Sequence, residues 1–329
     1  LIVDSKENAD PTPDTITIFS QDSSSTFNPG DGFVIIDRVY DREGGNSANL
    51  HLTKSGTADQ PITWTTLGTV IIDAQKTQAY GIYIYPASSL VIKNFIIENA
   101  RSYGIYANGS SRNRIEENTI LLNYRGINWS AGAGNYYYNV FKKNIIFSNE
   151  TNGIQLSYPS QNAVLENILF DNSSVGISIT SGKNQRPIIS NNVIFGNSSG
   201  ISFLYSDYVT VKNNLIFSNS TAGLVTSNEA TYNKILNNVF VSNTDGINFY
   251  SSTDSNNEVK NNIFAYNSDD GLDDNGTSLY DFNLYYQNTT DYEGLSSIGS
   301  NSITGQDPLF YIEDSGQLEA GSTQDILYD

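Results

Sequence analysis

The segment Asn267–Asp274 carries the densest group of side chains that could do chemistry. It reads Asn-Ser-Asp-Asp-Gly-Leu-Asp-Asp, so Asp269, Asp270 and Asp273 place three carboxylates within five residues. Carboxylates held this close repel one another unless a cation or protons neutralise them. Calcium binds clusters of carboxylate and amide oxygens, so the segment suggests a Ca²⁺ cofactor.

A fourth carboxylate belongs to the same group by its position in a repeat. Asp245 precedes Gly246 just as Asp270 precedes Gly271. If the two segments stack as neighbouring strands, their carboxylates lie about one strand spacing, ~4.8 Å, apart. We therefore expect one metal site; an acidic, solvated turn is the alternative. The expected ligands are Asp245, Asp269, Asp270 and Asp273.

The elements that position these residues are copies of one repeated phrase. At Asn214 an Asn is followed by three apolar residues, a second Asn at 219, and the pair Gly223-Leu224. A fixed period in the low twenties with strand-like apolar runs indicates a solenoid. The glycines lie 22 to 27 residues apart, and the copies begin at Asn94, Asn118, Asn144, Asn167, Asn192, Asn214, Asn238, Asn262 and, more weakly, Asn283.

The residues after each Gly alternate as in a strand, with apolar side chains pointing inward. Each repeated Asn is expected to stack on the next, so that side-chain amides donate and accept along the column and satisfy turn backbone groups. Asp274 falls in an inward column, so either the strand shifts register there or the core becomes polar. The row expected to face outward reads Tyr83, Tyr106, Asn128, Gln155, Ser178, Ser202, Val225, Asn248 and Asp273.

These features resemble the right-handed parallel β-helix superfamily, the pectate-lyase-like fold. The resemblance rests on the segments Ile115–Asn123, Gly104–Tyr106 and Lys54–Trp64, and on the closing segments Gly305–Phe310 and Leu318–Ser322. The resemblance implies an all-β, single-stranded right-handed parallel β-helix of about 11–12 coils of 22–27 residues. We expect residues 1–30 to be an irregular N-terminal segment, 31–310 the β-helix and 311–329 an acidic C-terminal tail or closing coil.

The resemblance is specific for the fold and weak for function, because lyases, hydrolases, epimerases, phage spikes and surface proteins share it. The spacing of Asp269, Asp270 and Asp273 is similar to the calcium-binding aspartates of one pectate lyase family. A lyase also needs a base, usually Lys or Arg in this superfamily, yet no Lys or Arg follows Lys260. The catalytic residues stay unknown; the candidates from earlier coils are Lys234, Lys260 and Arg186, with the sole histidine, His51, far upstream.

Two kinds of surface residue suggest contacts with sugars. Exposed tyrosine rings can stack on a polysaccharide or surface glycan or line a protein contact, and they can equally be ordinary strand-surface residues. The expected carbohydrate-binding residues are Tyr83, Tyr85 and Tyr106. Sequons outside the best ladder positions are candidate glycosylation sites, namely Asn108, Asn275 and Asn288, of which Asn288 is itself a weak ladder member.

Alternation on the second strand of each coil predicts an outward apolar stripe. Its aromatic members are Phe147, Phe170, Phe195 and Phe217, each flanked by Ile, Val or Leu. A monomer seldom exposes an apolar patch this long. The stripe should therefore be covered, either by the chain's own termini or a strand bend, or by another subunit in a homo-oligomer or filament.

Composition narrows the function further. The net charge of −18 argues against nucleic acid, since phosphate binding needs clustered Lys and Arg. No apolar run reaches the roughly 18 residues of a membrane span. The absence of Met, even at position 1, suggests a processed secreted chain. We expect an extracellular or cell-surface solenoid with a structural, adhesive or glycan-contacting role, leaning away from catalysis; a calcium-dependent polysaccharide lyase or related carbohydrate-active enzyme is the alternative.

Overall fold

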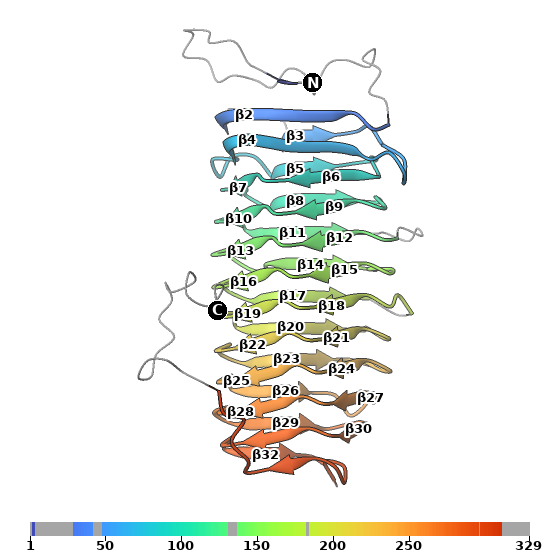
Figure 1. The fold of residues 1–329 in the computed structure, drawn as a ribbon, viewed down its shortest axis with the longest axis vertical. Coiled ribbons are helices and arrows are strands. Elements are labelled where there is room, and N and C mark those ends of the chain that lie inside the picture. The colour runs from blue at the N-terminus through green and yellow to red at the C-terminus, as the bar shows by residue number, and fades with distance from the viewer. Residues whose placement is uncertain are drawn as a thin grey trace.

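The computed structural model describes residues 2–3, 29–41, 48–130, 137–181, 184–295 and 297–310. The expected tail 311–329 and most of the expected N-terminal segment 1–30 lie outside these residues. The described chain forms one stack of parallel coils that runs from blue to red in Figure 1. The all-β parallel solenoid predicted from the sequence is confirmed, and its eleven coils fall within the predicted number.

Three strands per coil give the body three faces. The first and second faces belong to one 22-stranded sheet, and the third face is a separate 11-stranded sheet. The first strands of the chain are β1 (Ile2–Val3), β2 (Gly32–Asp41) and β4 (Ile62–Asp73). The long strand β4 spans the first two faces, because it pairs with both β6 and β7.

The remaining strands repeat in order. The first face holds β6 (Leu90–Lys93), β9 (Arg114–Glu116), β12 (Val140–Lys142), β15 (Ala163–Leu165), β18 (Ile188–Ser190), β21 (Thr210–Lys212), β24 (Lys234–Leu236), β27 (Ser255–Lys260) and β30 (Thr277–Asp281). The second face holds β7 (Ile96–Glu98), β10 (Thr119–Leu121), β13 (Ile145–Phe147), β16 (Ile168–Phe170), β19 (Val193–Phe195), β22 (Leu215–Phe217), β25 (Val239–Val241), β28 (Ile263–Ala265), β31 (Leu284–Tyr286) and β33 (Ile303–Thr304). The third face holds β3 (Ala48–Leu52), β5 (Tyr80–Ile84), β8 (Tyr103–Asn108), β11 (Arg125–Ser130), β14 (Ile154–Ser157), β17 (Val175–Thr180), β20 (Ser199–Leu204), β23 (Ala222–Ser227), β26 (Asp245–Phe249), β29 (Asp270–Asp274) and β32 (Thr290–Glu293).

The core is a column of apolar side chains from all three faces. On the third face the residues expected inward, such as Ile177 and Ile179, are fully buried. The large Trp129 lies in register with the small Ala107 of the previous coil, which keeps the layer filled without a clash. The inward residues of the second face are buried as predicted: Ile120, Ile146, Leu169, Ile194, Ile216 and Phe240.

Stacked asparagines hold the corners between the faces. At Asn192 the backbone N–H and Nδ2 both donate to Oδ1 of Asn214, each over 2.9 Å. Nδ2 also donates to the carbonyl oxygen of Val164, while Oδ1 accepts from Asn167. Each amide thus satisfies buried backbone groups at a tight turn. This pattern confirms the predicted ladders from Asn118 to Asn283 and from Asn123 to Asn288.

Two features of the ladders differ from the sequence expectation. A third ladder lies at the corner between the third and first faces, where Asn113 donates to Asn139 and Asn139 to Asn162. The expected first copy, at Asn94 and Asn99, is one residue out of register. Phe95 and Ala100 occupy the ladder columns there, because their N–H groups donate to Oδ1 of Asn118 and Asn123. Asn94 and Asn99 instead adopt left-handed backbone angles, which suit Asn at a turn.

Steric crowding explains why each repeat has a glycine after its second Asn. A Cβ at Gly200 would lie 2.5 Å from the carbonyl oxygen of Gly223 and 2.7 Å from Cγ2 of Ile216. The ladder amide of Asn219 is also within 3.2 Å of that position. No side chain fits where the third face begins, so Gly recurs a few residues after each second Asn.

We expect Asn192→Leu to destabilise the protein, because it leaves the buried backbone N–H and one side-chain N–H of Asn167 without their acceptor. Each such group costs roughly 1–3 kcal/mol. Thermal unfolding of Asn192→Leu and of Asn275→Leu measures this cost, since Asn275 is exposed and outside every ladder. Equal melting temperatures for the two variants would show that the ladder does not stabilise the fold.

Candidate functional site

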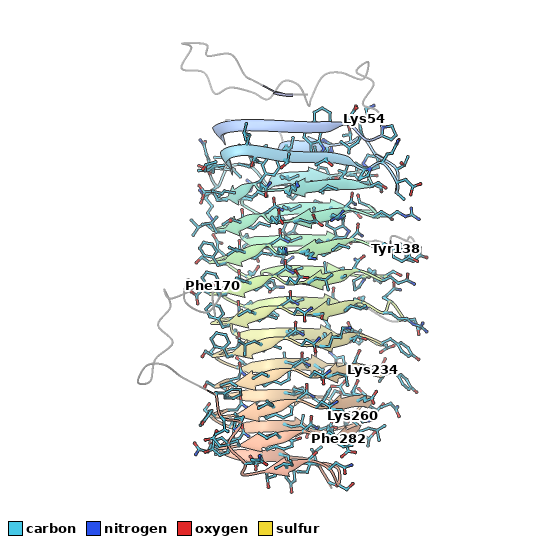
Figure 2. All side chains as sticks on the ribbon, viewed as in Figure 1. Lys54, Tyr138, Phe170, Lys234, Lys260 and Phe282 are labelled. Atoms are coloured by element: carbon cyan, nitrogen blue, oxygen red, sulfur yellow. The ribbon has the colours of Figure 1, made fainter. Side chains whose placement is uncertain are left out.

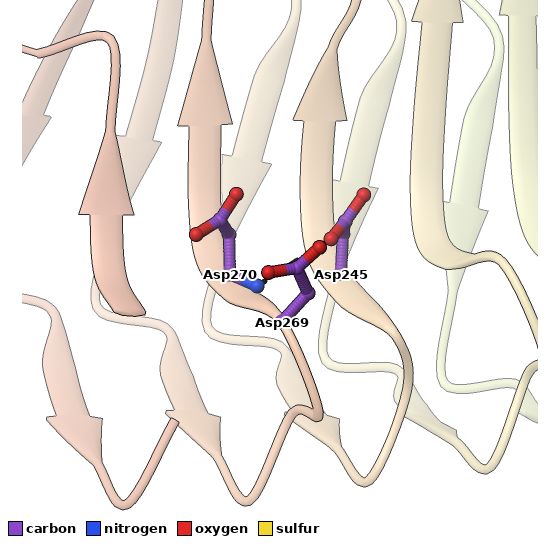
Figure 3. Close-up of side chains that lie close together, drawn as sticks. All are labelled: Asp245, Asp269 and Asp270. Carbon is purple, nitrogen blue, oxygen red and sulfur yellow. Dashed lines mark hydrogen bonds between the residues drawn. The ribbon is translucent and has the colours of Figure 1, made fainter. Parts of the chain in front are cut away.

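The strands β26 and β29 bring the predicted acidic residues together on the third face. Ligand oxygens of Asp245, Asp269 and Asp270 all lie within 4.8 Å of one another. Figure 3 shows Asp245 and Asp270 side by side on neighbouring coils, with Asp269 between them. Asp270 is only 5 % exposed, and its Oδ1 has no hydrogen-bond partner. A buried carboxylate oxygen without a donor has lost its hydration with no replacement, which is the condition a bound cation relieves.

Asp273, the fourth expected ligand, lies outside this close group. It sits further along β29, in register with Asn248 on one side and Glu293 on the other. Asn248 donates from Nδ2 to Oδ2 of Asp245 over 2.9 Å, so this amide joins the two halves of the cluster. Glu293 was not among the expected ligands; its position in the outward row, one coil beyond Asp273, was the signal that could have found it.

The cluster is electrostatically strained in the absence of a cation. Burial, together with Asp269, Glu293 and Asp245, raises the pKa of Asp270 to about 6. Burial, together with Asp270, Glu293 and Asp245, raises the pKa of Asp273 to about 6. Both shifts have the causes expected for carboxylates that share a poorly hydrated site.

The strand that carries Asp274 does not shift register. Asp274 lies beside Phe249, and its side chain is 1 % exposed. The core therefore becomes polar at this coil. Asp274 accepts hydrogen bonds from the backbone of Gly276 and the hydroxyl of Tyr280, which satisfy the buried carboxylate.

The candidate bases have partners elsewhere. Lys234 and Lys260 both pair with Glu258 on the first face, and Arg186 lies over the ring of Tyr208. Figure 2 shows both lysines on the first-face side of the body. His51 is exposed on β3, many coils from the cluster, and stacks on Tyr83. None of these contacts places a basic side chain beside Asp270.

The outward row connects the acidic cluster to the expected tyrosines. Successive strand pairs place Tyr83, Tyr106, Asn128, Gln155, Ser178, Ser202, Val225, Asn248 and Asp273 in one line, as predicted. The row is aromatic at one end, polar in the middle and acidic at the other end. Tyr80 and Tyr103, which precede Gly81 and Gly104, add two rings that the sequence interpretation missed.

The tyrosines stack on one another rather than presenting their faces. Tyr83 lies between His51 at 4.6 Å and Tyr106 at 5.4 Å, with interplanar angles of 16° and 8°. Tyr85, which is 48 % exposed, lies beside the same ring. Both faces of Tyr83 are therefore covered, and the row offers ring edges and hydroxyl groups to a ligand.

The expected glycosylation residues lie in three different settings. Asn275 is exposed, and Asn108 at the end of β8 is half-buried. Asn288 ends an asparagine ladder, where its Oδ1 accepts from Asn267 over 2.8 Å. Its amide is engaged in the fold, so Asn275 is the most accessible of the three.

Comparison with known families identifies the chain. Residues 138–305, more than half of the chain, match a family model described as periplasmic copper-binding protein (NosD). The chain belongs to the NosD family. Residues 63–201 of this NosD-family chain also match a model described as right handed beta helix region, which confirms the predicted hand and superfamily. A search of curated proteins gave no match.

Solved structures share the fold of this NosD-family member. They include the pectate lyase Pel9A, with 18 % identity over 72 % of each chain and a TM-score of 0.55. The A-module of Azotobacter vinelandii mannuronan C-5 epimerase AlgE6 has 15 % identity, coverage of 84 % and 90 %, and a TM-score of 0.60. The Dettilon tailspike protein has 14 % identity, coverage of 85 % and 63 %, and a TM-score of 0.61. At these identities the likeness shows the fold alone.

The residues present do not fit the copper in the NosD family description. Copper sites in proteins are built mostly from imidazole, thiolate and thioether ligands. This chain has no Cys, no Met and a single His. His51 is already engaged, since its Nε2 lies 3.2 Å from the carbonyl oxygen of Tyr85. The clustered ligands are all carboxylates, which prefer a hard cation such as calcium. Within the described residues, no helix is long and apolar enough to cross a membrane.

We expect the metal-free protein to lose stability as pH rises from about 4 to about 6. Folded Asp270 and Asp273 hold protons that the unfolded chain, with carboxyl pKa values of about 3.9, has already released. The stabilisation is therefore full below the unfolded pKa and lost as pH passes the folded pKa. Melting temperatures in chelator at several pH values measure it, and the double variant Asp270→Asn/Asp273→Asn should show a shallower decline. An identical decline in the two proteins would place the titrating groups elsewhere.

Proposed function

We propose that this chain is a non-catalytic β-helix that acts outside the cytoplasm, holds a calcium ion at Asp245, Asp269 and Asp270, and contacts a polysaccharide along its third face. The observation that carries the proposal is the buried, unpartnered Oδ1 of Asp270 amid two further carboxylates. It lies at the end of a row of polar and aromatic side chains that a linear polymer could follow.

Calcium suits the cluster in charge and in ligand type. Three carboxylates supply the oxygen ligands that calcium takes, and the backbone around them is fixed by strand pairing. Asp273 and Glu293, beside the close group, add negative charge that attracts a cation or a cation-bridged acidic sugar. Such bridging would let an acidic polymer approach a protein whose own net charge is −18.

A non-catalytic role fits the partners of the basic side chains. A lyase would need a base beside the calcium-bound sugar. The cation nearest in sequence, Lys260, is held by Glu258 over 2.7 Å on another face. The middle of the outward row, from Asn128 to Val225, contains neutral polar and apolar side chains. Such a surface supports binding of a neutral or cation-bridged glycan better than proton abstraction.

Location outside the cytoplasm is supported by two observations. The family description names a periplasmic protein, and proteins of the same fold include a pectate lyase and a mannuronan epimerase. The names of these two proteins give the polysaccharides pectate and mannuronan as what they act on. The proposed partner is therefore a polysaccharide or surface glycan in the periplasm or at the cell surface.

We expect calcium to raise the melting temperature of metal-stripped protein. A ligand that binds only the native state at about 100 times its Kd adds about 2.7 kcal/mol. Asp270→Asn should abolish the rise, because it removes the buried ligand at the centre of the cluster. Differential scanning calorimetry with and without millimolar calcium measures both.

The matched control is Asp59→Asn, which removes an exposed carboxylate at the other end of the body. It should leave the calcium response intact. A flat response of the wild-type protein to calcium would reject the metal site, whatever the variants do.

We expect the tyrosine row to bind glycans through its hydroxyl groups. Because the ring faces are covered, Tyr83→Phe should weaken binding nearly as much as Tyr83→Ala, whereas Tyr250→Ala, a 73 % exposed tyrosine outside the row, should not. Affinity electrophoresis in gels containing polygalacturonate or alginate, with calcium present, compares the variants. Full binding by Tyr83→Phe would contradict recognition by hydroxyl groups.

The same preparations test the absence of catalysis. Incubation with either polymer should produce no unsaturated uronate, which is detected by its ultraviolet absorbance. Its formation by wild-type protein and loss in Asp270→Asn would establish a calcium-dependent lyase instead.

A further inference from the structure

The second face carries an apolar surface that the described residues leave without a cover. Strand pairing confirms that Ile145 and Phe147 of β13 lie in register with Ile168 and Phe170 of β16, and so on down the face. Successive phenyl rings stack at 4.8 to 5.1 Å with nearly parallel planes. We call this surface the apolar stripe; its members are Ile145, Phe147, Ile168, Phe170, Val193, Phe195, Leu215, Phe217, Val239 and Val241.

Exposure varies along the apolar stripe. Ile145, at one end, is 40 % exposed. Phe217, further toward the C-terminal coils, is only 5 % exposed although it points outward. Phe217 stacks on Phe195 at 4.8 Å and lies in register with Val241. The stripe is therefore a continuous apolar surface that is most exposed at Ile145.

The path of the chain beyond the last coil leads to this surface. The final strand, β33, pairs with β31 and so lies on the second face. After β33 the chain stays beside this face, where the hydroxyl of Tyr286 donates to Oδ2 of Asp307 over 3.5 Å. The pKa of Tyr266, one coil earlier, is raised by burial and by the Asp307 carboxylate. Figure 1 shows these last residues, in red, running back past β28.

The remaining segment has the length and the side chains to cover the stripe. Nineteen residues follow Phe310, enough to span roughly 60 Å when extended. Six strand spacings separate β31 from β13, or about 29 Å. Apolar residues recur through the segment at Tyr311, Ile312, Leu318, Ile326, Leu327 and Tyr328.

We propose that residues 311–329 lie along the apolar stripe of their own chain. Tethering makes this contact intramolecular, so the segment competes at high effective concentration with any second copy. The contact covers the surface that would otherwise drive side-by-side association. The contact depends on neither the metal site nor glycan binding.

Introduced cysteines test the contact directly, because the natural chain has none. The full-length variant Leu318→Cys/Val193→Cys should form an internal disulfide under oxidised glutathione, seen as a faster monomer band on a non-reducing gel. The control Leu318→Cys/Ser202→Cys, with its second cysteine on the third face, should not. A disulfide-linked dimer from Val193→Cys alone would show that a second copy covers the stripe and would overturn the proposal, as would equal internal cross-linking in the control.

A chain ending at Phe310 gives a second readout. It should bind the dye anilinonaphthalene sulfonate and associate in light scattering, while its circular dichroism stays that of a β protein. Adding Phe170→Ser and Phe195→Ser to the shortened chain should reverse both effects. An unchanged dye signal and mass after shortening would contradict the proposal. If the shortened chain does not fold, the cysteine pairs in the full-length protein still decide the question.

Discussion

The stacked side-chain amide of asparagine is the interaction on which this structure depends. A triangular coil must turn at each corner, and each turn leaves backbone N–H and C=O groups that the strands cannot pair. The Asn at the corner accepts from the coil before it and donates to the coil after it, with every bond between 2.8 and 3.4 Å along the two long ladders. Because one amide serves two coils, the whole column must keep the same spacing. The ladder thus fixes the register of the strands between the corners.

Register in turn decides what the surface can do. Residues far apart in sequence become neighbours at one strand spacing, so a single recurring position forms a continuous row. On the third face this rule converts scattered tyrosines into a stacked aromatic row, and it converts Asp245, Asp269 and Asp270 into one cluster. The cluster gathers charge where hydration is poor, which explains the raised pKa values of Asp270 and Asp273. Related folds with other residues on the same positions can perform other chemistry, so the fold itself does not assign a function.

Much of this arrangement can be predicted from the sequence, because a regular repeat length determines which residues become neighbours on adjacent coils. Spacing alone predicted the inward columns, the outward row, the apolar stripe and the meeting of Asp245 with Asp270. The third ladder escaped notice, although Asn113 and Asn139 precede the next ladder Asn by the same five residues. Pro187 and Val209 interrupt that column and hide its period. The first copy of the repeat was misplaced by one residue. Asn94 and Asn99 adopt left-handed backbone angles at the turns and do not stack in the ladders. Sequence spacing does not distinguish these two roles of Asn. Ring orientation and the path of the chain after β33 depend on packing in three dimensions, which no pattern encodes.

We propose as the central point that this NosD-family chain binds a hard cation at its cluster of carboxylates and does not bind copper there. Equilibrium dialysis of metal-stripped protein against calcium and copper(II) at equal, low concentrations, followed by elemental analysis, tests it most directly. We predict that the wild-type protein retains calcium and that Asp270→Asn does not. The amount of copper retained should be the same in the two proteins. Copper retained in place of calcium, or calcium retained equally by both proteins, would contradict it.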